Sequence, residues 1–259
     1  MERRAEMRLG VDRWWRCLML ALLLPLADGL ASAGAVAAEG GPVGPELAAA
    51  EARGAVFKVC SGQTYALCAV ASCFVLNGVA YCTCEVKQGD SISLPFKYGA
   101  GQNVCTVNAG GAGNGFMVST FSPPPEVVAP RGDLALYTCP AASATGAYAQ
   151  CDGGICFRST QGQDFPGAHE QLGPNQIICS CPITVANPAT ARTGYQIAGP
   201  YPCRRSFFRY CDGAVASTRT GATIYVGAPT GTARLLTRLL EGSAPPFNRC
   251  DSPASALLP

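Results

Sequence analysis

Cysteine is the residue with the widest chemical repertoire in this chain, which contains fifteen of them. Two pairs are separated by a single residue, Cys82-Thr-Cys84 and Cys179-Ser-Cys181. Such thiols can hold a metal ion, exchange disulfides or form structural cross-links. Zinc sites usually leave about two to four residues between paired cysteines, and setting aside Cys17 leaves fourteen cysteines, an even number. We therefore predict a disulfide framework with no metal and no cofactor.

Thiol–disulfide exchange is the chemistry that competes with a purely structural framework. A bond between Cys82 and Cys84 would close a small ring, and strained disulfides are readily reduced. Reactive thiols, however, need an electropositive and accessible environment, whereas the acidic Glu85 directly follows Cys84. A thiol–disulfide redox protein is therefore kept as an alternative function, and counting free thiols under denaturing conditions would distinguish it.

The single histidine of the chain, His169, could contribute acid–base or metal chemistry. Glu170 follows it and Asp164 lies five residues upstream, so an imidazole and two carboxylates fall within one short stretch. Glycines in the same stretch favour a polar surface loop instead. The sequence contains no nucleophile elbow, metalloprotease histidine pair or phosphate-binding glycine loop. We expect a protein without catalysis, and the alternative is an extracellular enzyme that uses these three residues.

A short segment between Cys203 and Cys211 combines three arginines with three aromatic residues. Arginine and aromatic side chains are enriched in binding hot spots, and guanidinium groups fit phosphate and carboxylate. The other interpretation is a strand that alternates buried aromatic rings with solvated guanidinium groups. The candidate binding residues are Arg204, Arg205, Phe207, Phe208 and Arg209. The partner they imply is anionic, such as a glycan, a lipid head group or an acidic protein loop.

The N-terminal segment, residues 1–37, predicts export. Several arginines precede an apolar run from Cys17 to Leu26, and small residues such as Ala35-Val-Ala37 follow. This order is typical of a cleaved signal peptide, whereas a membrane anchor, the other interpretation, needs about 20 apolar residues. We expect the mature chain to be secreted or periplasmic, with no transmembrane helix and with an extracellular or envelope partner. The formal net charge of +2 gives no global attraction to nucleic acid.

The elements that position these residues are predicted by an internal repeat. Tyr65-Ala-Leu-Cys68 resembles Tyr148-Ala-Gln-Cys151, and in both cases a Cys-Phe dipeptide begins five residues after the first cysteine. Pro-rich residues 122–133 are expected to separate the copies as a stiff, extended linker. We predict a first cysteine-rich β unit over 38–121 and a second over 134–259. Matching cysteines recur in order as Cys60, Cys68, Cys73, Cys82, Cys84 and Cys105, and as Cys139, Cys151, Cys156, Cys179, Cys181 and Cys203.

The dipeptide Asn77-Gly78 between apolar runs predicts a β-hairpin with a type I′ turn. In the register of a two-residue loop, Cys73 faces Cys82 at a non-hydrogen-bonded position. Opposite Cα atoms at such a position lie about 4.5 Å apart, which a disulfide can span. We therefore predict a bridge between these two cysteines.

The repeat extends this pairing to the second copy, and two cysteines outside it are expected to join each other. The predicted bridges are Cys73–Cys82, Cys156–Cys179 and Cys211–Cys250. Four further cysteines in each copy allow three pairings each, and the sequence does not choose among them. We expect all of these to be bridged as well: Cys60, Cys68, Cys84, Cys105, Cys139, Cys151, Cys181 and Cys203.

Short helices are expected at both ends of this framework. Residues 45–53 contain good helix formers between a proline and Gly54. Residues 232–241 begin at a capping Thr232, end at Gly242 and carry one apolar stripe. The sequence therefore predicts a mainly β protein, built from two tandem disulfide-rich units with short flanking helices. Its expected function is that of an exported, disulfide-stabilised binding or structural protein.

Overall fold

The computed structural model describes residues 56–96, 99–129, 133–139, 146–165, 167–168, 171–185, 194–211 and 218–251. The chain divides into two units, Met1–Ala38 and Glu39–Pro259, and every described residue belongs to the second. The predicted signal peptide and the helix expected over 45–53 therefore lie outside the described residues. Within the described ranges, no helix has the length and apolar character that crossing a bilayer requires.

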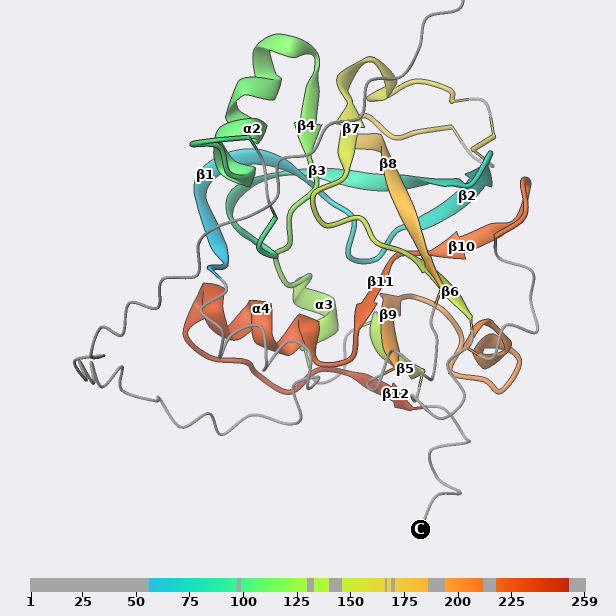
Figure 1. Ribbon diagram of the computed structural model, residues 1–259. Helices are drawn as coiled ribbons and strands as arrows, with labels where there is room; N and C mark the ends of the chain where they lie inside the picture. Colours follow the sequence, from blue (N-terminus) through green and yellow to red (C-terminus); the bar gives the residue numbers. More distant parts are fainter. Residues whose placement is uncertain are drawn as a thin grey trace, which may run out of the picture. The chain divides into compact units, whose positions relative to one another are not determined.

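The protein is mainly β, as predicted, and the larger of its two sheets has eight strands. Six of them lie side by side in the order β10-β2-β3-β8-β7-β4, while β1 pairs with β3 and β6 with β8 (Figure 1). All these pairs are antiparallel. The strands are β1 Lys58–Leu67, β2 Ser72–Leu76, β3 Val79–Ser93, β4 Phe116–Val118, β6 Ala147–Ala149, β7 Ile155–Phe157, β8 Gln176–Val185 and β10 Thr223–Tyr225.

The smaller sheet has four strands in the order β11-β9-β5-β12. Strand β12 runs parallel to β5, and the other two pairs are antiparallel. The strands are β5 Ala135–Cys139, β9 Tyr195–Gly199, β11 Gly227–Pro229 and β12 Arg249–Asp251.

The hairpin predicted from Asn77-Gly78 is confirmed by β2 and β3. Asn77 has φ +50° and Gly78 has φ +79°, and two positive φ values are what a type I′ turn requires. The register pairs Cys73 with Cys82, as the two-residue loop predicts. Their Cα atoms are 3.9 Å apart, somewhat closer than expected.

The Cys73–Cys82 pair belongs to a row of cross-strand neighbours that runs across six adjacent strands of the larger sheet. Strands from both sides of residues 122–133 take part in it, and the row has the same pattern from either end. Two copies related by a two-fold axis between β3 and β8 would give this pattern. The internal repeat itself stays a proposal. In strand order the row is Ile224, Cys73, Cys82, Cys179, Cys156 and Met117.

The main core cluster lies on this face of the larger sheet and is rich in sulfur. Its cysteines are at most 5% exposed, and they pack with aliphatic residues such as Val75 and Ile177. Disulfides thus occupy the positions where a larger protein core would place large aliphatic side chains. The cysteines of this cluster are Cys68, Cys73, Cys82, Cys84, Cys151, Cys156, Cys179 and Cys181.

The helices are short and connect or cover the sheets. Asn103 caps the first of them: its side chain accepts hydrogen bonds from the backbone N–H groups of Cys105 and Thr106. The helices are α2 Val104–Gly111, α3 Pro125–Val128 and α4 Thr232–Glu241, and the 3₁₀ turns are η1 Ala112–Asn114, η2 Arg158–Thr160 and η3 Phe207–Tyr210.

The helix predicted over 232–241 is confirmed as α4, which packs against β3 and β11. Leu235 and Leu236 are buried, so the helix covers the core with this face. The helix ends at Gly242 as predicted, with φ +76°. The expected cap is wrong, because Gly231 occupies the N-cap and the Thr232 hydroxyl donates instead to the Pro229 carbonyl at 2.6 Å.

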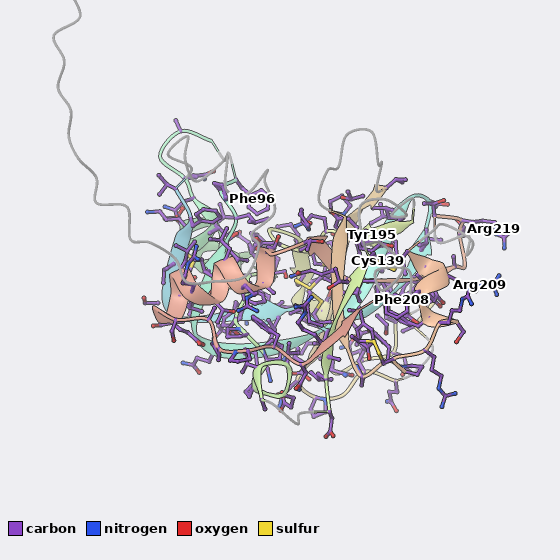
Figure 2. All side chains as sticks on the ribbon, turned by 90° about the horizontal axis from the view of Figure 1, so that it is seen from below. Phe96, Cys139, Tyr195, Phe208, Arg209 and Arg219 are labelled. Carbon is purple, nitrogen blue, oxygen red and sulfur yellow. A yellow bond between two sulfur atoms is a disulfide. The ribbon has the colours of Figure 1, made fainter. Side chains whose placement is uncertain are left out.

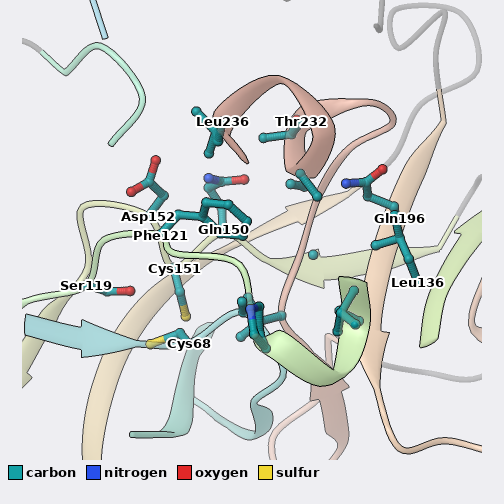
Figure 3. Close-up of a pocket in the computed structure, with 18 of the residues that line it drawn as sticks. Cys68, Ser119, Phe121, Leu136, Gln150, Cys151, Asp152, Gln196, Thr232 and Leu236 are labelled. Atoms are coloured by element: carbon teal, nitrogen blue, oxygen red, sulfur yellow. The ribbon is translucent and has the colours of Figure 1, made fainter. Parts of the chain in front are cut away.

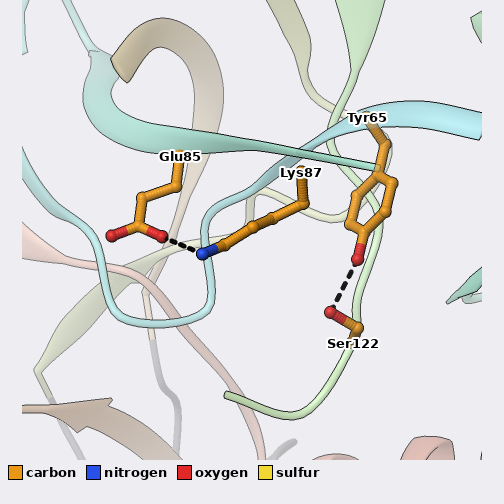
Figure 4. Close-up of polar contacts among 4 residues, drawn as sticks. All are labelled: Tyr65, Glu85, Lys87 and Ser122. Atoms are coloured by element: carbon orange, nitrogen blue, oxygen red, sulfur yellow. Dashed lines mark hydrogen bonds and ion pairs between the residues drawn. The ribbon is translucent and has the colours of Figure 1, made fainter. Parts of the chain in front are cut away.

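Residues 122–133 do not form the uniformly extended linker that their prolines predict. Pro125 begins helix α3, because a proline at the first turn of a helix costs no hydrogen bond. Val127 of this helix is buried with Leu136 of β5. At the start of the segment, the Tyr65 hydroxyl donates to the Ser122 hydroxyl at 2.7 Å (Figure 4). The described part of the segment is therefore attached to both sheets.

Candidate functional site

All fourteen cysteines that follow the N-terminal segment lie within the described residues, and all are joined in seven disulfides. Two of these are the predicted hairpin bridges, Cys73–Cys82 and Cys156–Cys179. Two further bridges lie next to them, Cys68–Cys84 and Cys151–Cys181, and they join cysteines that the predicted repeat places at matching positions. The remaining three are Cys60–Cys105, Cys139–Cys211 and Cys203–Cys250.

The predicted bridge Cys211–Cys250 is wrong. Cys211 bonds to Cys139, and Cys250 bonds to Cys203. The prediction matched Cys203 with Cys105 because each follows a tyrosine, Tyr195 or Tyr98, at a similar distance from the closely spaced cysteines. In the structure, Cys105 lies in the helix before β4 and Cys211 directly follows the 3₁₀ turn before β10, so the predicted repeat would match Cys105 with Cys211 instead.

The closely spaced cysteines form neither a redox pair nor a metal site. Cys82 and Cys84 bond to different partners, so the small reducible ring does not exist. Sulfur atoms gather here in two groups of three, and within each group they lie within 4.8 Å of one another. The groups are Cys68, Cys84 and Cys179, and Cys82, Cys151 and Cys181. A metal needs thiolates, and every one of these sulfurs is already in a disulfide.

The histidine-containing stretch is described only in part. Asp164 is exposed, and His169 and Glu170 lie outside the described residues, so their convergence stays a prediction. Before them, Phe165 lies 5.8 Å from both the Phe74 and Tyr81 rings, measured between centroids. This part of the connection between β7 and β8 therefore folds back over the outer face of the β2–β3 hairpin.

The segment from Cys203 to Cys211, here called the arginine segment, is fixed at both ends. Cys203 is bonded to β12 and Cys211 to β5, so the smaller sheet anchors each end. Between them the chain forms the 3₁₀ turn η3 rather than the alternating strand that was the other interpretation. The arginine segment is thus attached covalently to the smaller sheet at both ends.

Two buried phenylalanines fix the middle of the arginine segment. Phe207 and Phe208 are each 6% exposed and belong to an aromatic cluster. Phe207 packs on Tyr137 at 4.9 Å and stacks on Tyr201 at 5.1 Å between ring centroids. Burial raises the pKa of Tyr225, another ring of the cluster, to about 12. The two phenylalanines of the cluster are buried anchors that expose too little surface for a ligand to contact.

The three guanidinium groups of the arginine segment are exposed. Arg204, Arg205 and Arg209 form no ion pair with any carboxylate in the described part of the chain, where the single ion pair joins Lys87 to Glu85 at 2.5 Å (Figure 4). Figure 2 shows Arg209 projecting outward, whereas the neighbouring Phe208 lies toward the interior. The segment therefore presents a rigid positive surface. Of the five predicted binding residues, three are exposed and two are buried.

A hollow of about 480 Å³ lies beside the aromatic cluster. Tyr201 and Tyr225 line it from the cluster, Phe74 lines it from the hairpin, and Gln171 from the β7–β8 connection. Its volume is in the range of small-molecule sites. Glu85 also lines the hollow, and the negative charge of this carboxylate disfavours an anion inside it. The arginine surface therefore remains the candidate for binding an anion.

Sequence reasoning missed Asp152, whose carboxyl group is half-buried and hydrogen-bonded at the edge of an apolar pocket. The Leu94 backbone N–H donates to one of its oxygens at 2.7 Å, and the Ser93 hydroxyl donates to the other at 3.1 Å. Desolvation raises the pKa of Asp152 to about 7, against the lowering effect of these hydrogen bonds. The available signal was a difference between the two predicted copies, because Cys151 is followed by Asp152 where Cys68 is followed by Ala69.

The chain was compared with protein-family models, with curated proteins and with solved structures, and none of them matches it.

Proposed function

We propose that this chain is an exported binding protein that recognises an anionic glycan through the arginine segment. The seven disulfides support a location in an oxidising compartment, where such bonds form and persist. The observation that carries the proposal is a set of three exposed guanidinium groups, paired with no described carboxylate, on a segment fixed by two disulfides and two buried rings.

Rigidity matters because an ordered segment loses little conformational entropy when a ligand binds. Guanidinium groups bind carboxylate and sulfate oxygens through paired, charge-assisted hydrogen bonds. A lipid surface is the weaker candidate, because the phenylalanines of the segment are buried and cannot insert. Membrane-binding basic clusters also tend to hold about four to eight cations, whereas this segment holds three.

The test measures heparin binding by the mature chain at low ionic strength. We expect native protein to bind and salt to weaken binding, because exposed charges are screened. An Arg204→Ala/Arg205→Ala/Arg209→Ala variant should bind at least tenfold more weakly, since each exposed charge pair contributes roughly 0.5–1 kcal/mol. The Phe207 and Phe208 anchors are untouched, so the circular dichroism spectrum should not change.

The matched control removes the same amount of charge elsewhere. Lys58, Lys87 and Arg158 are also exposed, and a Lys58→Ala/Lys87→Ala/Arg158→Ala variant should keep most of the affinity. Equal losses in both triple variants would show that net charge alone drives binding and would reject the arginine surface. Binding to phosphatidylserine vesicles but not to heparin would reject a glycan as the partner.

A further inference from the structure

A second pocket, distinct from the arginine segment, lies between the two sheets and helix α4 (Figure 3). It has a volume of about 80 Å³, enough for a few non-hydrogen atoms, since a water in the liquid occupies about 30 Å³. It is not enclosed, so a larger molecule could place one end inside. Its walls are mostly apolar and include Leu94, Phe121, Val127, Leu136, Leu236 and Phe247.

The pocket lies where corresponding turns of the chain meet. Residues 68–69 and 150–152 follow β1 and β6, and residues 119–121 and 226–228 follow β4 and β10. These turns are joined in matching ways: the Ser119 N–H donates to the Gly154 carbonyl at 2.9 Å, and the Val226 N–H donates to the Ala71 carbonyl at 3.0 Å. The backbone around the pocket is therefore fixed by hydrogen bonds from both halves of the chain.

The side chains on these matching turns differ in one important respect. Asp152 and Gln150 line the pocket from the second turn, whereas the first turn offers Ala69 and Cys68. Asp152 is the one acidic group that the described pocket wall contains. Gln150 forms no side-chain hydrogen bond with the described residues, so its amide is available to a ligand.

No cation of the described residues neutralises Asp152. Its hydrogen bonds come from the Ser93 hydroxyl and from backbone N–H groups. Arg234, the cation on the helix that closes the pocket, lies over the Phe247 ring at 5.9 Å from its centroid and forms no ion pair with Asp152. No charged group contributes to the raised pKa of Asp152, which comes from desolvation. An unpaired carboxyl group at an apolar pocket is costly unless a ligand supplies the missing charge.

We propose that this pocket binds a primary ammonium group carried on a short apolar chain, with Asp152 accepting from the ammonium and Gln150 accepting beside it. A carboxylate has about four acceptor positions, so the existing donors leave room for the ligand. The apolar wall then covers the alkyl chain, which favours an alkylammonium over an inorganic cation. This site is separate from the arginine segment, so its failure would leave the glycan proposal standing.

The experiment titrates the mature protein with n-butylamine, n-butanol and butyrate and follows amide shifts by NMR. At pH 8 the amine is charged, since alkylammonium groups titrate near 10.4, and Asp152 is ionised. We expect n-butylamine to bind at least tenfold more tightly than n-butanol, and butyrate not to bind, because tenfold corresponds to about 1.4 kcal/mol, which is less than the coupling measured between close charge pairs. The affected amides should include Leu94, Gly153 and Gly227.

Two further measurements keep the result decisive. Asp152→Asn, which preserves the shape of the side chain, should remove the preference for the amine, while the exposed control Asp164→Asn should keep it. In native protein, the affinity for n-butylamine should fall as the pH is lowered through about 7. Equal binding of amine and alcohol, a preference that survives Asp152→Asn, or no binding of any probe would each overturn the proposal.

Discussion

The carboxyl group of Asp152 bears on two properties of this protein, the pH dependence of its stability and the ligand that we propose for its pocket. Its carboxyl group is desolvated beside an apolar pocket, and it receives hydrogen bonds that only partly offset the loss of water. Arg204, Arg205 and Arg209 show the opposite situation, because their charged groups remain in water. The same chain thus contains a desolvated carboxyl group and an exposed positive surface, and we propose ligands of opposite charge for the two sites.

The pH dependence of stability follows from the raised pKa of Asp152. This pKa is about 7 in the folded protein, against an ordinary value of 3.8, so protonation favours the folded state below the lower value. The advantage is lost as the pH rises to about 7. Asp152→Asn should therefore gain stability relative to native protein between about pH 4 and 7, by up to a few kcal/mol, measured by thermal unfolding.

The control for this prediction is Asp164→Asn, whose side chain is exposed. Its melting temperature should follow that of native protein across the same range. A constant offset between Asp152→Asn and native protein at every pH would contradict the titration of Asp152 in this range.

At the scale of the element, the long connection between β7 and β8 is shaped by one glycine. Gly167 has φ +95°, and a Cβ there would lie 2.6 Å from Cε2 of the Phe74 ring. Phe165 packs on the same ring. The connection can therefore cover the hairpin only because the residue that passes over Phe74 has no side chain.

Gly167→Ala should release this connection from the hairpin. We expect a loss of roughly 2–4 kcal/mol, combining the cost of a left-handed alanine with overpacking against the ring. Hydrogen exchange should rise in residues 157–165. Gly162→Ala is the matched control, since Gly162 is also left-handed, with φ +68°, but its nearest neighbour would be an ordinary 3.7 Å contact with Pro174. Equal destabilisation by both variants would contradict the role of the close approach.

At the scale of the whole molecule, disulfides replace much of a conventional apolar core. Four bridges lie in the main core cluster, among residues that are at most 7% exposed. The bridges at the ends of the arginine segment instead join it to the smaller sheet. Cys139–Cys211 is as buried as the core bridges, whereas Cys203 of the other bridge is exposed.

This arrangement predicts the order in which the bridges open under mild reduction of the native protein. Cys203 is exposed and Cys105 is half-buried, so Cys203–Cys250 and Cys60–Cys105 should be reduced first. The four bridges of the core cluster should resist until the protein unfolds, because a thiolate must reach the sulfur it attacks. Pulsed alkylation with mass spectrometry measures this order. Early reduction of Cys73–Cys82 would contradict it.

The sequence by itself determined the features that depend on nearby residues. Asn77-Gly78 specified the hairpin turn, the turn specified the register, and the register placed Cys73 opposite Cys82. Helix α4 followed from its own stripe and its terminal Gly242. These features need no long-range information, because turn geometry and side-chain periodicity act over a few residues.

Only the tertiary structure decided which distant elements meet. The partners of Cys203 and Cys211 depend on how β12 and β5 pair, which sequence spacing does not encode. The desolvation of Asp152 likewise requires turns, sheets and α4 to converge around it. Contacts between residues far apart in the chain are fixed by the packing of the whole fold, so a cysteine count or a local pattern leaves them open.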